Sequence, residues 1–213
     1  MDKIDYSLYL VTDSNLFVDD TALLFATEQA LKSGVTLVQL REKNLTSIEF
    51  YRLAIKMRDL TAKYSRPLII NDRLDIALAT AADGVHLGQS DLPADATRKI
   101  VSKDFIIGVS AKTLEQALIA EAAGADYLGV GAIFPTTTKV ITKPTSIATL
   151  KNIVQTVKIP VVAIGGINVA NLDSLIASEI SGIAVVSAIL TAKNIGQTVT
   201  QLKSKVALIK NNL

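Results

Sequence analysis

The sequence predicts an α/β protein with a (β/α)8 TIM barrel fold. Along the 213 residues, short runs rich in Val, Ile and Leu alternate with longer segments of helical period, and we count eight such pairs. Eight alternating units in roughly 200 to 250 residues fit a closed barrel, whereas an open doubly wound sheet of this length usually has fewer parallel strands. Because no linker or low-complexity tract divides the chain, we expect residues 1–213 to form a single barrel domain.

The expected strands are short apolar runs rich in β-branched residues. They are LYLVTD (8–13), TLVQLRE (36–42), PLIIND (67–72), GVHLG (84–88), FIIGVSA (105–111), DYLGVGAIF (126–134), PVVAIGG (160–166) and GIAVVSA (182–188). Each strand is followed by a segment that can form a helix, as a βα repeat requires.

Capping residues mark several of the expected helices. Thr46 and Glu49 have the spacing of a capping box, and Thr113 precedes the helical run LEQALIAEAAG. A further helical run, RLDIALATAA, follows two residues that can act as caps, Asn71 and Asp72. Glycines after helical runs are expected to adopt the left-handed closing conformation at three positions, Gly34, Gly84 and Gly124.

Composition excludes several classes of protein. Lys plus Arg number 22 against 20 Asp plus Glu, with no long run of one sign, which argues against a nucleic-acid or membrane-surface protein. The chain has no Cys and one His, so disulfide frameworks, thiolate metal sites and histidine-rich zinc sites are not expected. The N-terminal MDKIDYSLYLVTD resembles neither a signal peptide nor a membrane span, and we expect a cytoplasmic protein.

The second expected strand has one polar face. Side chains alternate along a strand, so Val38 and Leu40 face the helices while Gln39, Arg41 and Lys43 face the barrel axis. Active sites on this fold lie at the carboxyl ends of the strands. A cation buried there needs an anionic partner, which predicts either an anionic ligand or a structural ion pair. A strand that ends early in solvent is the remaining alternative.

Carboxylates follow the next two strands. Asp72 comes after Asn71 at the end of the third strand, and Asp91 follows the fourth in GVHLGQSD. Two carboxylates at one rim can hold Mg²⁺, with water and phosphate oxygens completing the octahedron. Each Asp could instead be a helix cap or loop residue. His86, inside an apolar strand, is interpreted as a hydrogen-bonded core residue rather than a catalytic base.

The later strands end in groups that suit a phosphate. Ser110 lies near the end of the fifth strand, where its hydroxyl could donate a hydrogen bond to an anion or cap the next helix. After the seventh strand, Gly165 and Gly166 allow backbone N–H groups to approach a ligand closely. The loops after strands seven and eight are the recurrent phosphate site of this fold. Further candidates in the last three strand exits are Thr136, Thr137, Thr138, Lys139, Val186 and Ser187, with a surface turn as the alternative for the Thr-rich segment. Two anion sites at one mouth suggest group transfer between phosphorylated small molecules.

The motifs VQLREK, IINDR, GVHLGQSD, IGVSAKT, GVGAIFPTTTK, VAIGGI and AVVSAI occur in this order over nearly the whole chain. This set resembles the thiamine phosphate synthases, and the resemblance covers roughly residues 8 to 190. It implies a (β/α)8 barrel transferase that joins 4-amino-2-methyl-5-hydroxymethylpyrimidine diphosphate to 4-methyl-5-(2-hydroxyethyl)thiazole phosphate with Mg²⁺. In that reaction the diphosphate leaves first and the thiazole nitrogen captures the resulting cation.

The resemblance also implies residue roles. Binding of the pyrimidine diphosphate is implied for Gln39, Arg41, Lys43, Asn71, Ser110 and Lys139, of which Arg41, Lys43, Ser110 and Lys139 would be catalytic. Thiazole phosphate binding is implied for Thr136, Thr137, Thr138, Gly166, Val186 and Ser187, and the Mg²⁺ ligands would be Asp72 and Asp91. The chain departs from the family pattern after Lys139, where VITKPTSIATL lacks the usual acidic residue and glycine, and at Ala132, where many synthases have proline.

Two other functions on the same barrel remain alternatives. A thiazole tautomerase would be expected to have a histidine near Ala132, whereas the one histidine is His86. A noncatalytic phosphate-ligand sensor would not need both carboxylates and Lys139. The expected partners are small phosphorylated molecules, with no nucleic acid and no membrane. The sequence is compatible with a homodimer but identifies no interface.

Overall fold

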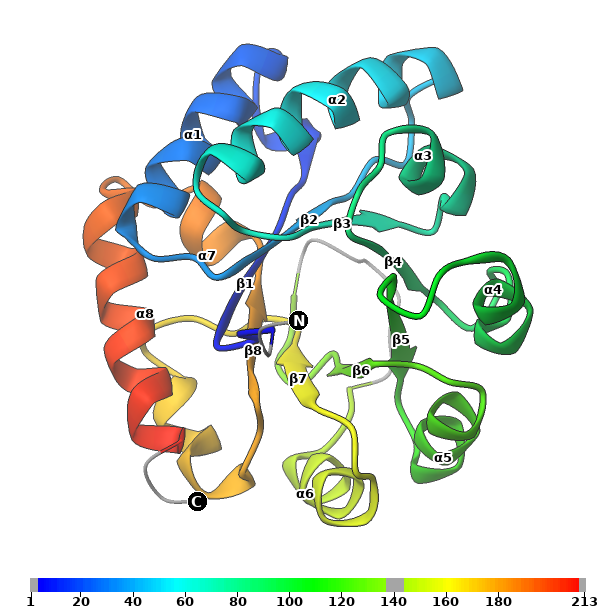
Figure 1. The fold of residues 1–213 in the computed structure, drawn as a ribbon. Coiled ribbons are helices and arrows are strands. Elements are labelled where there is room, and N and C mark those ends of the chain that lie inside the picture. Colours follow the sequence, from blue (N-terminus) through cyan, green and yellow to red (C-terminus); the bar gives the residue numbers. More distant parts are fainter. Residues whose placement is uncertain (1–3, 137–143, 211–213) are drawn as a thin grey trace.

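The computed structural model describes residues 4–136 and 144–210. Eight parallel strands pair in chain order, and β8 pairs with β1 to close the barrel (Figure 1). The strands are β1 (Leu8–Val11), β2 (Leu37–Leu40), β3 (Leu68–Asn71), β4 (Gly84–Leu87), β5 (Ile106–Ala111), β6 (Tyr127–Gly131), β7 (Val161–Ile164) and β8 (Gly182–Val185). Each lies inside one of the expected ranges, so the predicted (β/α)8 fold is confirmed.

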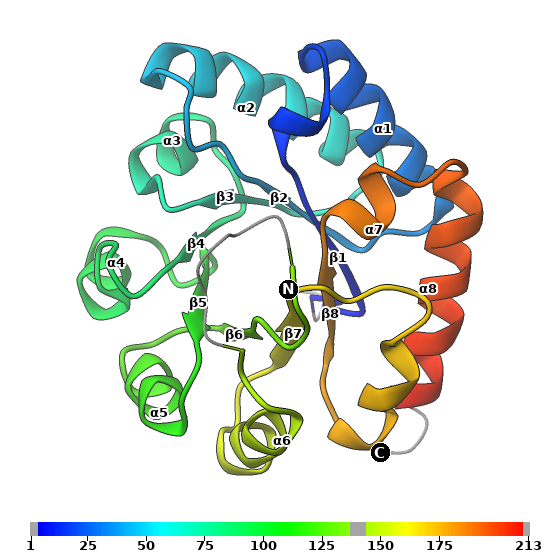
Figure 2. The same ribbon diagram turned by 180° about the vertical axis from the view of Figure 1, so that it is seen from behind.

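Helices form a ring outside the barrel, as the two opposite views show (Figures 1 and 2). They are η1 (Ser14–Leu16), α1 (Asp20–Ser33), α2 (Ser47–Lys63), α3 (Leu74–Ala79), α4 (Ala94–Ile100), α5 (Leu114–Ala122), α6 (Ile147–Thr156), η2 (Leu172–Ser178), α7 (Ser187–Leu190) and α8 (Ile195–Lys210). The segment after β7 forms the 3-10 helix η2 instead of an α-helix. Among the described residues, no helix is both long and apolar enough to cross a membrane.

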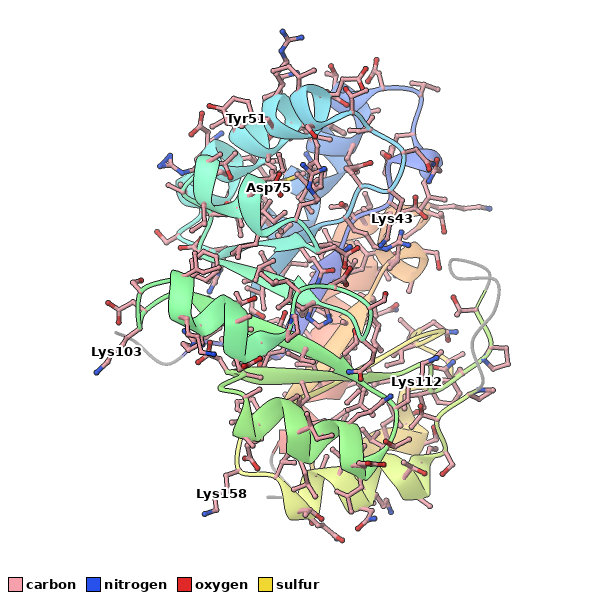
Figure 3. The ribbon with its side chains drawn as sticks, turned by 90° about the vertical axis from the view of Figure 1, so that its right-hand side faces the viewer. Lys43, Tyr51, Asp75, Lys103, Lys112 and Lys158 are labelled. Atoms are coloured by element: carbon pink, nitrogen blue, oxygen red, sulfur yellow. The ribbon has the colours of Figure 1, made fainter. Side chains whose placement is uncertain are left out.

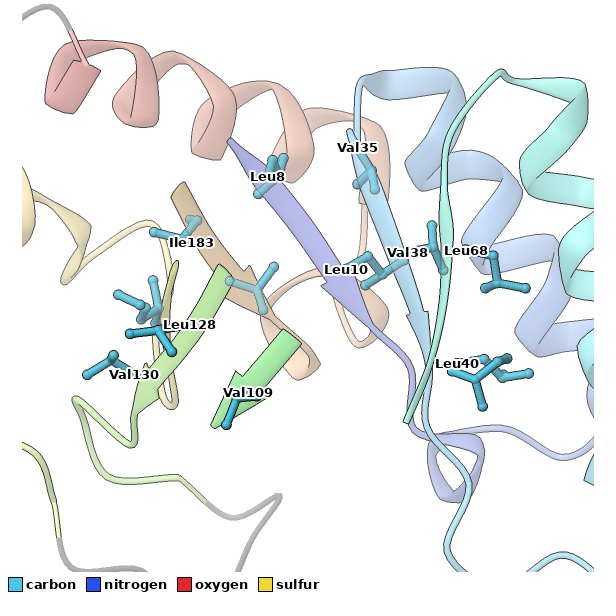
Figure 4. Close-up of a cluster of buried hydrophobic side chains, with 14 of the residues drawn as sticks. Leu8, Leu10, Val35, Val38, Leu40, Leu68, Val109, Leu128, Val130 and Ile183 are labelled. Carbon is cyan, nitrogen blue, oxygen red and sulfur yellow. The ribbon is translucent and has the colours of Figure 1, made fainter. Parts of the chain in front are cut away.

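Strand alternation divides the core into two layers. Leu8 and Leu10 of β1 point outward and pack with Val38, Leu40 and the helices (Figure 4). Tyr9 and other inward-facing side chains fill the barrel interior, which consists of Tyr6, Tyr9, Val11, Leu37, Ile69, Ile106, Tyr127, Val162 and Ala184. Full burial of one leucine, such as Leu8 or Leu10 in the outer layer, stabilises the fold by roughly 1.5–3 kcal/mol. Packing between the strands and the helices therefore fixes the positions of the strand ends.

Most of the predicted helix caps are present. The Thr46 and Glu49 side chains form the capping box of α2, and the Thr113 hydroxyl accepts a hydrogen bond from the Gln116 N–H at 3.2 Å at the start of α5. Neither Asn71 nor Asp72 caps α3, because Asn71 belongs to β3 and the N-cap is Arg73.

One of the three glycine predictions is wrong. Gly34 and Gly124 have the left-handed conformation, with φ of 114° and 86°. Gly84 does not; the left-handed residue before β4 is Ala81, with φ of 49°. Gly84 is needed for a different reason, because a Cβ atom there would lie 2.3 Å from the carbonyl oxygen of Ile106 on the neighbouring strand.

Candidate active site

A cavity of about 500 Å³ opens where the strands end at their carboxyl side. The strands are all parallel, so residues that follow different strands meet at this end of the barrel. In the side view, Lys43 and Lys112 lie toward this end, and Lys103 and Lys158 lie toward the other (Figure 3). The predicted site residues that line the cavity are Gln39, Arg41, Lys43, Asn71, Asp72, Asp91, Ser110, Thr136, Gly166, Val186 and Ser187.

The polar face of the second strand points into this cavity. Gln39, Arg41 and Lys43 all line it, as strand alternation predicts. The backbone N–H of Arg41 donates to Thr12 Oγ1 at 3.0 Å, which fixes the chain just after β2. Glu42, on the opposite face, is buried outside the cavity lining. Two cationic side chains are thereby directed at one ligand-sized space.

Asp72 and Asp91 bring two carboxyl groups together beside Lys43. Lys43 forms an ion pair with Asp72, and the Gly88 N–H donates to Asp91 Oδ2 at 2.7 Å. Burial opposes ionisation of Asp72, but the hydrogen bonds from Lys43 and Asp91 and the Lys43 charge lower its pKa overall. Burial and the hydrogen bond shared with Asp72 raise the pKa of Asp91. This half-buried acidic pair is a place where a cation would stabilise the ionised forms of both groups.

Asn71 and Ser110 add uncharged donors to the same wall. Asn71 Nδ2 is buried, and it has no hydrogen-bond partner among the described residues. An unpaired buried donor costs roughly 1–3 kcal/mol, so this amide is suited to meet a ligand. Ser110 Oγ lies 2.9 Å from His86 Nε2, and the Ser110 carbonyl accepts from Gln89 Nε2 at 2.7 Å.

A second region lies at the ends of β7 and β8. Gly165 and Gly166 have φ of 100° and 65° and follow β7, while Ser187 begins α7 after β8. A Cβ atom on Gly166 would lie 2.3 Å from the Pro135 carbonyl oxygen, so a side chain does not fit there. An adjoining hollow of about 490 Å³ is lined by Gly166, Ser187 and Thr136 among others. Residues with backbone N–H and hydroxyl groups therefore line this hollow, and such groups suit an anion.

Three predicted site residues, Thr137, Thr138 and Lys139, lie outside the described residues. All of the other predicted site residues line the cavity at the carboxyl ends of the strands. Their roles as ligand and metal contacts stay predictions.

Several residues that line the cavity were not predicted. Lys112 shares the inward face with Ser110 two positions earlier, so strand alternation carries a signal for it. Tyr9 and Tyr127 extend the cavity floor and join His86 in a hydrogen-bonded group. In the sequence, each of these tyrosines is an aromatic residue at an inward-facing strand position. That pattern is equally typical of ordinary core packing, so it does not predict a cavity residue. His86 is buried and hydrogen-bonded, as expected, yet it also lines the cavity.

Comparison with known proteins gives consistent results. Residues 8–189 match the family described as thiamine monophosphate synthase. The chain is 56% identical over 200 residues to the thiamine-phosphate synthase of Ruminiclostridium cellulolyticum, covering 94% of this chain and 95% of that protein. It is 53% identical to the Clostridium acetobutylicum thiamine-phosphate synthase, covering 92% of each.

A solved structure agrees with these sequence matches. The thiamine phosphate pyrophosphorylase from Pyrococcus furiosus superposes with a TM-score of 0.86 at 39% identity, covering 97% of this chain and 98% of that one. The match therefore extends over the whole barrel, including every strand end that contributes to the cavity. On this sequence and structural similarity, the chain belongs to the thiamine monophosphate synthase family.

Proposed function

We propose that this protein is a thiamine phosphate synthase, a transferase that joins 4-amino-2-methyl-5-hydroxymethylpyrimidine diphosphate to 4-methyl-5-(2-hydroxyethyl)thiazole phosphate. The observation that carries this proposal is that two groups of residues suited to anions line one cavity: Arg41, Lys43, Asp72 and Asp91 form the first, and Gly166 and Ser187 the second. One phosphorylated substrate at each region would bring the two reacting rings together between them. The family match and the names of the relatives support this assignment.

The first region fits a divalent metal ion, and we propose Mg²⁺. Asp72 and Asp91 supply adjacent carboxylate oxygens, the hard donors that Mg²⁺ prefers. When bound, the ion would neutralise charge that builds up on the diphosphate. Within residues 4–136 and 144–210, no group of three or more His, Cys, Asp or Glu side chains could hold a metal. The remaining coordination positions would therefore be filled by water and substrate oxygens.

The reaction requires one bond to break and one to form. The carbon–oxygen bond between the pyrimidine methylene and the diphosphate breaks, and its electron pair leaves with the diphosphate. The lone pair of the thiazole nitrogen then forms the new carbon–nitrogen bond. Arg41, Lys43 and Lys139 would stabilise the departing charge, while Gln39, Asn71 and Ser110 would hold the pyrimidine substrate. The protein contributes mainly positioning and charge stabilisation.

The second region would hold the thiazole phosphate. Gly166 leaves its backbone accessible, and hydroxyl groups are supplied by Thr136 and Ser187. We assign the same role to Val186, Thr137 and Thr138. Anchoring the phosphate here would direct the thiazole nitrogen toward the pyrimidine methylene carbon.

An end-point assay tests the proposal. Purified protein is incubated with both substrates and Mg²⁺, and thiamine phosphate is detected after oxidation to its fluorescent thiochrome derivative. Product that requires both substrates and the metal supports the synthase assignment. Folded protein that binds thiazole phosphate but forms no product would favour the tautomerase or the sensor. The tautomerase is the weaker alternative here, because Ala132 lines the cavity where that enzyme is expected to have a histidine.

We further propose that the single barrel, residues 1–213, is the catalytic domain and that it acts in the cytoplasm on small molecules, without nucleic acid. Every described residue of the proposed site comes from this barrel. A charge is costly to move into an apolar medium, so the multiply charged substrates would not cross a bilayer unaided. A homodimer is compatible with this arrangement, since one chain supplies all the described residues that line the cavity.

A further inference from the structure

A continuous set of hydrogen bonds crosses the floor of the cavity inside the barrel. Gln39 Nε2 lies 2.8 Å from Tyr9 Oη, and Tyr9 Oη lies 2.8 Å from Tyr127 Oη. Tyr127 Oη lies 2.9 Å from His86 Nδ1, and His86 Nε2 lies 2.9 Å from Ser110 Oγ. We call these five groups the polar chain. It takes one residue from each of β1, β2, β4, β5 and β6.

Glycines on the neighbouring strands make room for the polar chain. A Cβ atom on Gly108 would lie 2.1 Å from Tyr127 Cζ, and one on Gly129 would lie 3.0 Å from His86 Cε1. The Tyr127 ring also packs against the Tyr6 ring in a tilted arrangement, with ring centroids 4.9 Å apart. The rings of Tyr127 and His86 therefore sit in fitted spaces, and their polar atoms are held in place by packing.

The two phenols stay protonated. Burial raises the pKa of both Tyr9 and Tyr127 well above the ordinary tyrosine value. Each hydroxyl therefore has one hydrogen to donate, and a buried hydrogen without an acceptor is costly.

Gln39 sets the direction of hydrogen-bond donation along the polar chain. The Gln39 amide nitrogen can only donate, so Tyr9 Oη accepts from it. Among the described residues, the Tyr9 hydroxyl has two hydrogen-bond partners, Gln39 and Tyr127, so its own hydrogen goes to Tyr127. The Tyr127 hydrogen then goes to His86 Nδ1.

The other end of the polar chain is determined in the same way. A neutral imidazole that accepts at Nδ1 bears its hydrogen on Nε2, and His86 Nε2 therefore donates to Ser110 Oγ. The hydrogen of Ser110 is then directed away from His86. Ser110 lines the cavity, so that hydrogen is available to an acceptor atom of a ligand.

We propose that the polar chain runs in one direction, that it holds His86 as the neutral Nε2–H tautomer, and that it thereby presents Ser110 as a hydrogen-bond donor to the ligand. Tyr9 and Tyr127 are positioning residues, because they act on the ligand only through His86 and Ser110. The tautomer is a property of the protein alone. The consequence for the substrate rests on the proposed function.

Nitrogen-15 NMR of the full chain tests the tautomer directly. The sequence has one histidine, so the imidazole signals of histidine-labelled protein belong to His86 without assignment. At neutral pH we expect a pyridine-type Nδ1 and a pyrrole-type Nε2. A protonated Nδ1, or signals averaged between the two tautomers, would overturn the proposal.

The substitution Gln39→Glu tests the direction. A carboxylate can only accept, so Tyr9 would donate to it, Tyr127 would donate to Tyr9, and His86 would donate from Nδ1. We therefore expect the tautomer to switch to Nδ1–H. If His86 keeps its original tautomer, donation does not pass along the polar chain.

The double substitution Gln39→Glu with Tyr9→Phe is the matched control. It keeps the new carboxylate but removes the hydroxyl that transmits its effect, so Tyr127 again has His86 as its acceptor. We expect the Nε2–H tautomer to return. Persistence of Nδ1–H would mean that the carboxylate acts on His86 through its charge and not through the hydroxyl groups.

Kinetics of Tyr127→Phe test the consequence for the substrate. Without a donor to His86 Nδ1, the Ser110 hydroxyl loses its fixed direction, and we expect KM for the pyrimidine diphosphate to rise on the order of tenfold. KM for the thiazole phosphate should stay unchanged, and equal effects on both substrates would contradict a role through Ser110. If the wild-type protein forms no thiamine phosphate, the proposed function fails, and the NMR results still decide the tautomer.

Discussion

Lys43, just after β2, forms an ion pair with Asp72, just after β3, and thereby ties the cationic side of the cavity to its acidic side. The same Asp72 carboxylate shares a hydrogen bond with Asp91, so the three side chains form one connected group. A diphosphate with its metal ion would exchange with these contacts. On the proposed function, we expect these three side chains to redistribute their charge when the diphosphate and its metal ion bind.

Replacing Asp91 should abolish most activity while the protein stays folded. In Asp91→Ala one of the two proposed metal ligands is absent, and we expect kcat/KM to fall on the order of 10²-fold or more. Asp95→Ala is the control, because Asp95 is an exposed acid on α4 paired only with Lys99 at 3.4 Å among the described ion pairs. Turnover near the wild-type level at low Mg²⁺ would refute the assignment of Asp91.

Replacing Arg41 should affect the two substrates unequally. Arg41→Ala removes a charge-assisted hydrogen bond to the proposed diphosphate, so its binding should weaken by roughly 10- to 100-fold. Binding of the thiazole phosphate should change little. Titration calorimetry with each ligand separately measures both affinities, with Arg58→Ala on α2 as a control for loss of a surface arginine. Equal weakening of both ligands would place Arg41 elsewhere in the cavity.

Adding one methyl group at Gly108 should destabilise the barrel. The Cβ atom would meet Tyr127 Cζ at 2.1 Å, and overpacking of this kind costs about 1–3 kcal/mol. Chemical denaturation of Gly108→Ala measures the loss as a shift in the unfolding midpoint. Gly196→Ala on α8 is the matched control, because its nearest contact is the Ser33 side chain at 3.1 Å and alanine favours a helix. A stable Gly108→Ala variant would show that the Tyr127 ring can move aside.

The contact between α1 and α2 should weaken in acid. Glu28 Oε1 accepts from Tyr64 Oη at 2.7 Å and from Lys63 Nζ at 2.9 Å, and these hydrogen bonds lower the pKa of Glu28 from 4.5 to about 2. Because the pKa is lower in the folded state, the stabilisation is complete above about pH 4.5 and is lost as the pH falls toward 2.

Thermal unfolding of Glu28→Gln tests this dependence. The Tm difference from wild type should be present at neutral pH and should shrink as the pH falls below 4.5. Tyr64→Phe removes the largest cause of the pKa shift, so in that variant the loss should be smaller and should be complete at a higher pH than in the wild type. A Tm difference independent of pH would show that the ionised form of Glu28 is not what matters.

The sequence predicts the barrel well, because the signal repeats in every βα unit. It also predicts the cavity-facing side of β2, since alternation alone separates Gln39 and Arg41 from Val38 and Leu40. The prediction for Gly84 is wrong because a glycine before a strand has the same sequence context in two cases. It can end a helix in the left-handed conformation, or it can leave room for the backbone of a neighbouring strand. The difference depends on Ile106, which is distant in the sequence.

The cavity floor was harder to predict. Tyr9 and Tyr127 come from strands that are not adjacent in the barrel, and their contact at 2.8 Å exists only across the closed interior. No local pattern encodes such a pairing. The roles of the cavity residues depend on bound substrates, and the substitutions of Asp91 and Arg41 test two of them. Thr137, Thr138 and Lys139 lie outside the described residues, and their roles stay predictions.

The pairing of β1 with β8 also determines when the barrel can close during protein synthesis. Tyr9 on β1 pairs with Ala184 on β8. Because β1 is synthesised first and β8 last, the barrel cannot close until β8 has left the ribosome. Such long-range pairing slows folding. A nascent chain that ends before residue 182 lacks β8 and Ser187. The closed barrel, and with it the cavity end that Ser187 lines, is therefore available only after nearly the whole chain has been translated.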